Sequence, residues 1–330
     1  MPLELYNPFE NLHFDDAICF LSGTELKNQD EKITVFPEWL LDKFNYRERK
    51  FILMDTVNST TYGELKLPCS TEVKLAYDTL DEEVKIAFEK GYEGMKNLDD
   101  TKLFLWIGRI IYGVLYYEIE QERARIQRQE REFGMSPVLK KRYGMFHLML
   151  QSLISPVCFE GQKAWSISIV KLKYSQEVFN HRDDAINLMF SLGVNGFGII
   201  ACLQDNGGIT AENEDILKKI GNQELHPVQF EELCARFLYL NYLKQVQADF
   251  KVNFTDEKAT IEALPLKAPL HKSVFTVWDN TMFEQVLEDY WTPWALTKKD
   301  IMKESGLPIS FLEDPYTFEF IDPNSISLAY

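Results

Sequence analysis

The sequence of 330 residues has little cysteine and a deficit of positive charge. Its five cysteines are widely spaced, odd in number and form no Cys-x-x-Cys pair, which excludes a disulfide framework and favours a reducing, cytoplasmic environment. Acidic residues number 51 and basic residues 35, so the formal net charge is −16. A chain this acidic repels phosphate at long range, which disfavours nucleic acid as a partner.

Long hydrophobic runs are also absent. The longest apolar stretch covers residues 103–117 and contains Arg109, so it is too short and too charged to span a bilayer. The first 16 residues are acidic and carry no secretory signal pattern. With 45% hydrophobic and 26% charged residues, the composition is typical of a folded soluble protein, and we expect no membrane partner.

The hydrophobic patterning predicts an α+β fold. In the first 96 residues we expect short strands at 18–23, 51–55 and 61–67, and a helix beginning at Pro37. A second helix should follow Ser70 and end near Gly91, because its apolar positions recur at helical spacing. These positions are Val73, Tyr77, Leu80, Val84 and Phe88.

The rest of the chain divides into long central helices and a second α+β region. Helices are expected at 99–133, 137–154 and 227–248, and strands at 165–173, 185–192, 197–203 and 251–255, with an extended tail after 304. The hairpin turn at 193–196 makes the sheet of this half antiparallel. We therefore predict a module at 1–96, central helices at 97–155 and an α+β domain at 156–330.

The segment KITVFPEWL, residues 32–40, resembles a segment of HNH-type endonucleases that usually reads Glu-His-Val-Phe-Pro-x-Trp-Leu. Ile33 and Thr34 stand where the acid and the histidine would be. Two further segments, CFLS at 19–22 and CSTE at 69–72, stand where treble-clef members of this family have two zinc-binding Cys-x-x-Cys knuckles. The resemblance covers roughly the first 120 residues and implies short strands and helices of treble-clef type.

The chemistry of that family is missing from these positions. A structural zinc needs four thiolate or imidazole ligands, whereas the two knuckles offer Cys19 and Cys69, with Ser22 and Glu72 as poor substitutes. No histidine occurs between His13 and His147, so the motif cannot supply a base for hydrolysis. We therefore expect vestigial knuckles, no metal and no cofactor.

The interpretation of vestigial knuckles requires the Cys19 and Cys69 side chains to lie close together. The alternative is that both are unrelated core residues, since buried free cysteine is common.

The sequence HRDD at 181–184 offers the other candidate catalytic residues. A kinase catalytic loop would need asparagine five residues after the first aspartate, and Leu188 is there instead. A polar turn before the next strand is the favoured interpretation. His181, Asp183 and Asp184 remain the candidate ligands of a divergent metal-dependent nuclease.

The most basic segment of the chain lies between residues 118 and 142. It is either a phosphate-contacting element or a solvated helix with internal ion pairs, and its interleaved glutamates favour the second. The nucleic-acid candidates are Arg123, Arg125, Arg128, Arg131, Lys140, Lys141 and Arg142.

Three features of apolar segments suggest structural roles. Gly108 and Gly113 should allow close helix packing, and Arg109 between them needs an ion-pair partner. The aromatic cluster at 276–296 is typical of a core or an interface.

The leading interpretation is a bacterial-type, cytoplasmic, non-catalytic remnant of an HNH-like protein that serves as a scaffold or interaction module. Its partner would be another protein or a second copy of the chain. The first alternative is a metal-dependent nuclease that uses residues of the second half. The second is a nucleic-acid-binding regulator that uses the basic segment 123–142.

Overall fold

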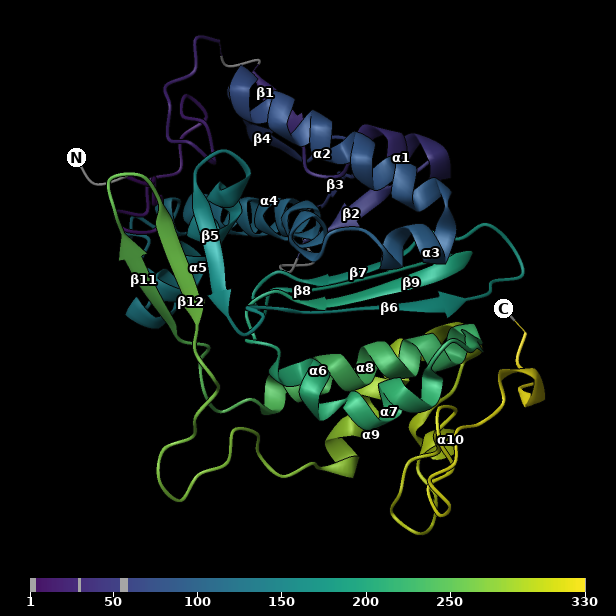
Figure 1. Ribbon diagram of the computed structural model, residues 1–330. Coiled ribbons are helices and arrows are strands. Elements are labelled where there is room, and N and C mark those ends of the chain that lie inside the picture. Colours follow the sequence, from purple (N-terminus) through teal and green to yellow (C-terminus); the bar gives the residue numbers. More distant parts are fainter. Residues whose placement is uncertain (1–3, 29–30, 54–58, 330) are drawn as a thin grey trace. The chain divides into compact units, whose positions relative to one another are not determined.

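The computed structural model describes residues 4–28, 31–53 and 59–329 and confirms the predicted α+β class (Figure 1). The chain forms two compact units. The first contains Met1–Glu89, Asn97–Glu160 and Lys251–Glu262, and the second contains Lys90–Lys96, Gly161–Phe250 and Ala263–Tyr330. The helices of the predicted central segment thus pack in the same unit as most of the predicted N-terminal module.

Two short antiparallel strand pairs begin the first unit. β1 (Lys32–Thr34) pairs with β4 (Lys66–Pro68), and β2 (Lys50–Ile52) pairs with β3 (Ser59–Thr61). The single strand predicted at 61–67 is wrong, because Glu64 accepts hydrogen bonds from Thr60 and Thr61 and turns the chain there. The predicted strand 51–55 ends at residue 52, and residues 54 and 55 lie outside the described ranges.

The strand predicted at 18–23 is reduced to a tight turn. Ile18 forms an isolated bridge with Glu25, and Gly23 between them has a φ of +71°, which only glycine adopts easily. The helix predicted after Pro37 is α1 (Glu38–Phe44), which buries Leu40 and Leu41.

The predicted helix after Ser70 is α2 (Thr71–Glu89), and all five of its expected apolar positions are buried. It is followed in this unit by α4 (Asp100–Gln127) and α5 (Pro137–Leu150), which ends in a short 3-10 turn, η1 (Gln151–Leu153). A Cβ added at Gly108 would lie 2.4 Å from Leu150, and one at Gly113 would lie 2.4 Å from Val35. The expected close helix packing is confirmed at Gly108, because Leu150 belongs to α5, whereas Gly113 makes room for Val35, which follows β1.

The first unit is completed by a three-stranded sheet in the order β11-β12-β5. Its strands are β5 (Val157–Gly161), β11 (Phe250–Phe254) and β12 (Ala259–Ala263).

The second unit is built on a five-stranded sheet in the order β10-β6-β9-β8-β7. The strands are β6 (Ser166–Leu172), β7 (Asn180–Asp184), β8 (Met189–Val194), β9 (Gly196–Cys202) and β10 (Glu224–Leu225). All neighbours are antiparallel except β10 and β6. The polar turn predicted at HRDD is wrong, because these residues form β7 and the turn follows at 185–188, where Asn187 donates two hydrogen bonds to Asp184.

Helices cover this sheet, as Figure 1 shows for α6 (Gly208–Glu212) and α8 (Pro227–Leu243). Gly193 and Gly198 leave room for Phe230 of α8, since an added Cβ would lie 2.8 Å and 2.2 Å from its ring. The predicted aromatic cluster is part of this core, where Trp291 is fully buried. The remaining elements are α3 (Gly91–Lys96), α7 (Glu214–Ile220), α9 (Asn280–Tyr290), η2 (Thr292–Trp294), α10 (Lys298–Ile301) and η3 (Pro323–Ser325).

Across the described ranges, none of the helices combines the length and the apolar character that a membrane crossing requires.

Candidate functional site

The turn at residues 19–24 brings Cys19 beside Cys69. The Gly23 amide donates to the Cys19 carbonyl at 3.0 Å, and the Phe20 amide donates to the Pro68 carbonyl at 2.8 Å, which places residue 19 next to residue 69. The Cys69 thiol is hydrogen-bonded to Cys19, which lowers the pKa of Cys19 to about 4 and raises that of Cys69. This is the proximity that vestigial knuckles require.

The other two knuckle positions differ in their surroundings. Ser22 forms hydrogen bonds to Cys19, whereas Glu72 is exposed in the first turn of α2. Both cysteines are buried. Within the described ranges, no three side chains of the His, Cys, Asp or Glu type are grouped so that they could hold a metal ion.

His147 of α5 fixes the same turn from the other side. Its Nε2 lies 2.7 Å from the Phe20 carbonyl oxygen, and its Nδ1 lies 3.1 Å from the Tyr6 carbonyl oxygen and 3.2 Å from Nε2 of Gln151. Gln151 Nε2 also donates to the Tyr6 carbonyl, at 2.8 Å. The Phe20 ring also stacks on Tyr77 with 6.1 Å between centroids. Hydrogen bonds and ring packing therefore fix this turn within the described structure.

Acid should weaken this arrangement through His147. Burial lowers the pKa of His147 to about 4, below the unfolded value of about 6.5, so its stabilisation is complete above pH 6.5 and is lost as the pH falls towards 4. We expect wild type to lose about 3 kcal/mol relative to His147→Gln between pH 7 and pH 4. Denaturant unfolding at both pH values measures this difference. The exposed control His271→Gln should follow wild type, and an equal pH dependence in His147→Gln would contradict the assignment.

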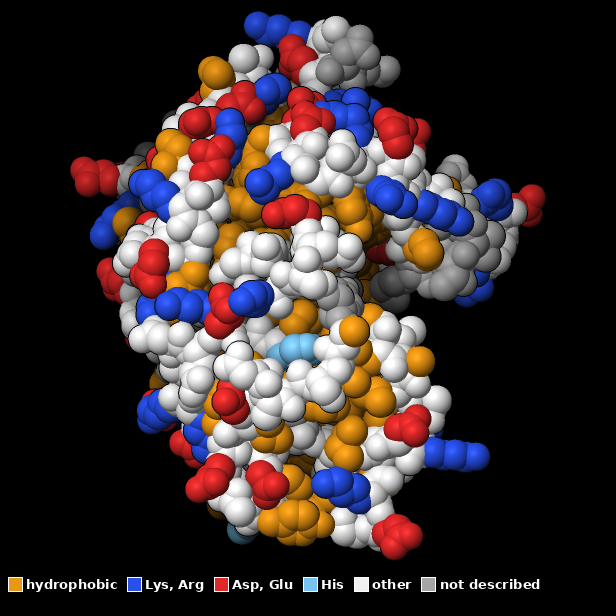
Figure 2. Space-filling view, turned by 90° about the vertical axis from the view of Figure 1, so that its right-hand side faces the viewer, with side chains coloured by type: hydrophobic (Ala, Val, Ile, Leu, Met, Phe, Trp, Pro, Cys, Tyr) orange, Lys and Arg blue, Asp and Glu red, His pale blue; other side chains and the backbone are white. Residues whose placement is uncertain are grey.

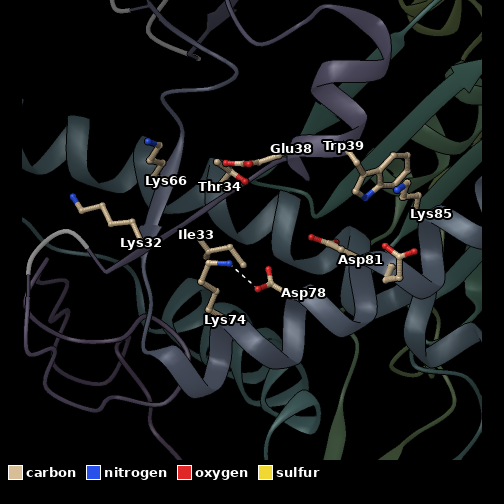
Figure 3. A pocket seen from close by; sticks show the side chains of 11 residues that line it. Lys32, Ile33, Thr34, Glu38, Trp39, Lys66, Lys74, Asp78, Asp81 and Lys85 are labelled. Carbon is tan, nitrogen blue, oxygen red and sulfur yellow. Dashed lines mark hydrogen bonds and ion pairs between the residues drawn. The ribbon is translucent and has the colours of Figure 1, made fainter.

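A pocket of about 510 Å³ lies between β1, β4, α1 and α2 (Figure 3). Ile33 and Thr34, which stand where the sequence resemblance would place an acid and a histidine, are part of its wall. Most of the lining is charged. The full set is Lys32, Ile33, Thr34, Glu38, Trp39, Lys66, Lys74, Asp78, Asp81, Glu82 and Lys85.

Both aspartates of the pocket are already neutralised by basic side chains. Asp78 pairs with Lys74 at 2.7 Å, as the dashed line in Figure 3 marks. The two oxygens of Asp81 accept from Arg109 at 3.0 and 2.8 Å, which confirms the ion pair expected for this arginine. Arg109 is fully buried, and its guanidinium lies 4.8 Å from the centre of the Tyr77 ring. Burial raises the pKa of Asp81, and Arg109 opposes that rise.

Three donors of the pocket have no acceptor in the part of the chain that the structure describes. They are the ammonium groups of Lys66 and Lys85 and the buried Nε1 of Trp39. The indole is held by Phe88, whose ring meets it edge-on at 5.2 Å. The pocket can therefore accept hydrogen bonds and negative charge from a bound molecule.

The HRDD residues do not form a ligand cluster. The His181 side chain is 2% exposed, lies 3.7 Å from Asp183, and has a pKa that burial lowers to about 3. Asp184 accepts hydrogen bonds from Asn187 and from Tyr242, at 2.8 Å for the tyrosine. Since alternate residues of a strand point to opposite faces, Asp184 points away from the other two.

The arginines of the basic segment are largely engaged within α4. Arg123 pairs with Glu120 and Arg125 pairs with Glu122, both at 2.6 Å, and Arg128 donates to the Ala124 carbonyl. This pairing favours a solvated helix. Arg131 follows α4, and Lys140, Lys141 and Arg142 lie on α5. On the face shown in Figure 2, basic and acidic side chains of the described residues are interspersed.

Sequence reasoning missed the pocket, although α2 contains a signal for it. Lys74, Asp78, Asp81 and Lys85 recur at spacings of four, three and four residues, so they form one stripe on the helix. This stripe runs beside the buried stripe that begins at Val73.

Comparison of the chain with protein-family models, with curated proteins and with solved structures gives no match. The features that bear on function are therefore the pocket and the turn that brings Cys19 beside Cys69.

Proposed function

We propose that the chain is a non-catalytic, HNH-like protein of bacterial type and cytoplasmic location that acts as an interaction module through its β1-β4-α1-α2 pocket. The observation that carries this proposal is the internal pairing of Asp78 and Asp81 with Lys74 and Arg109. These two carboxylates share the pocket with Ile33 and Thr34, where the resemblance places the family's acid and histidine.

The arrangement of the first unit supports an HNH-like origin. The turn with Cys19 is followed by β1, by the segment with Phe36 and Trp39, by β4 and then by α2 behind Cys69. This is the order in which the resemblance places the two knuckles around the motif. Phe36, Leu40 and Leu41 are buried, so the part of the motif that survives is the part that packs.

Hydrolysis requires a base that can take a proton from water. In this pocket Thr34 offers a hydroxyl where the resemblance places the family's histidine, and the two inner aspartates form ion pairs. Binding needs only complementary charge and shape, which the lysines and Trp39 provide. The pocket is therefore better suited to hold a partner than to cleave one.

A cleavage assay tests the absence of catalysis. Supercoiled plasmid DNA and single-stranded RNA are incubated with the full chain and with Mg²⁺, Mn²⁺ or Zn²⁺. We expect no more cleavage than the metal gives alone, because Asp78 and Asp81 form ion pairs and the described lining of the pocket contains no histidine. Metal-dependent cleavage that elutes with the protein and is lost in Asp78→Asn would refute the proposal at the pocket. Cleavage lost instead in Asp183→Ala would assign a nuclease to β7.

A further inference from the structure

The three hydrogen-bond donors of the pocket that have no acceptor among the described residues lie at its two ends. Figure 3 shows Lys66 and Lys32 together at one end and Lys85 beside Trp39 at the other. Lys32 pairs with Asp16 at 3.3 Å, whereas Lys66 and Lys85 have no carboxylate partner among the described residues. We propose that the pocket binds a small organic anion, in which a phosphate or carboxylate group is joined to a flat apolar part.

Two lysines of the pocket are free to bind an anion. Four lysines and four carboxylates line the pocket, so their formal charges cancel. The ion pairs of Asp78 with Lys74, of Asp81 with Arg109 and of Lys32 with Asp16 leave Lys66 and Lys85 as cations without a carboxylate partner among the described residues. An ammonium group in a partly enclosed pocket forms strong, charge-assisted hydrogen bonds with an anionic oxygen.

The size and walls of the pocket favour an organic molecule. Its volume of about 510 Å³ lies within the range of small-molecule sites, roughly 300–1,000 Å³, and is larger than an inorganic ion fills. Ile33 and Trp39 supply the apolar wall. The free Nε1 of Trp39 adds one neutral donor beside Lys85. The polar substituents of a flat group packed on the indole would therefore lie within hydrogen-bonding reach of Lys85 and of Nε1 of Trp39.

The exposed carboxylates of the pocket argue for a ligand with one anionic group. Glu38 and Glu82 are both exposed or partly exposed members of the lining, and Glu38 has only a distant partner, Arg47 at 3.9 Å. These carboxylates repel a chain of phosphates. A nucleic-acid strand is thus a poorer fit than a small molecule with one anionic group. The inference rests on the proposed function, because it names what the same pocket binds.

Calorimetric titration of the full chain tests the inference with four probes. Benzoate carries one anionic group on a flat ring, and adenosine 5′-monophosphate carries one that its ribose joins to a flat base. Adenosine lacks the charge, and inorganic phosphate lacks the ring. We expect binding of the monophosphate, of benzoate or of both, which also separates phosphate from carboxylate recognition. Adenosine and inorganic phosphate should each bind at least about tenfold more weakly than the better of these.

Variants locate the binding at the two ends of the pocket. Lys66→Gln and Lys85→Gln should each weaken binding roughly tenfold, and Trp39→Phe should weaken it severalfold by removing one neutral donor. Lys50→Gln removes an exposed lysine of β2 outside the pocket and should bind like wild type. Thermal unfolding of each variant checks that its fold is retained.

The inference is wrong if neither the monophosphate nor benzoate binds, or if Lys66→Gln and Lys85→Gln both bind them as wild type does. The proposed function survives that result as long as no cleavage is seen. Conversely, cleavage lost in Asp78→Asn removes the proposed function whatever the titration gives, so the two failures are distinguishable.

Discussion

The double variant Ser22→Cys/Glu72→Cys is expected to bind one zinc ion per chain, whereas wild type retains none in stoichiometric amount. Cys19 and Cys69 already lie together, and the new thiols would complete four ligands at the positions where the sequence resemblance predicts two knuckles. Because a structural zinc binds only the folded state, unfolding should cost about 4 kcal/mol more at a zinc concentration 1,000-fold above its Kd. Metal analysis after dialysis and thermal unfolding with and without zinc measure both effects.

The matched control moves one thiol away from the knuckle. Ser22→Cys/Glu82→Cys adds the same number of cysteines, but residue 82 lies nearly three turns along α2 from residue 72. It should hold zinc only weakly, and Co²⁺ should give a tetrahedral thiolate spectrum with the first variant alone. Equal zinc retention by the two variants would show that positions 22 and 72 do not form a vestigial knuckle.

The part of the fold that could be predicted is the part encoded by local periodicity. Val73, Tyr77 and Leu80 at helical spacing predicted both α2 and the face it buries. The HRDD segment could not be predicted in the same way, because its hydrogen bonds come from β8, its neighbour in the sheet. Four polar residues in a row are typical of a turn, and the sequence does not show that a neighbouring strand will pair with them.

The pocket also combines features that neighbouring residues predict with contacts between residues that are far apart in the sequence. That Arg109 needs a partner follows from its apolar neighbours, but the choice of Asp81 depends on how α2 packs against α4. Likewise, nothing in the sequence distinguishes Lys66 and Lys85 from other lysines, and only the fold brings Lys66 of β4 and Lys85 of α2 to the same pocket. The pocket around Ile33 and Thr34 could therefore not be predicted from the sequence.

Arg109→Met is expected to lower the free energy of unfolding by about 3–5 kcal/mol. The substitution keeps most of the buried volume but leaves the Asp81 carboxylate, which is 15% exposed, without the two hydrogen bonds that offset its desolvation. It also removes the cation that lies over the Tyr77 ring. Asp81→Asn should cost a similar amount, because it leaves a guanidinium buried beside a neutral amide. Urea unfolding of both variants gives the two values.

The double variant Arg109→Met/Asp81→Leu separates the ion pair from simple packing. Once both charges are gone no uncompensated group is buried, so its loss should be smaller than the sum of the two single losses by at least about 2 kcal/mol. The control is the exposed ion pair of Lys74 and Asp78, which lies on α2 as Asp81 does. Lys74→Met should lower the free energy of unfolding by less than about 1 kcal/mol. Additive losses at Arg109 and Asp81 would mean that the arginine stabilises the protein through its packing and not through its ion pair with Asp81.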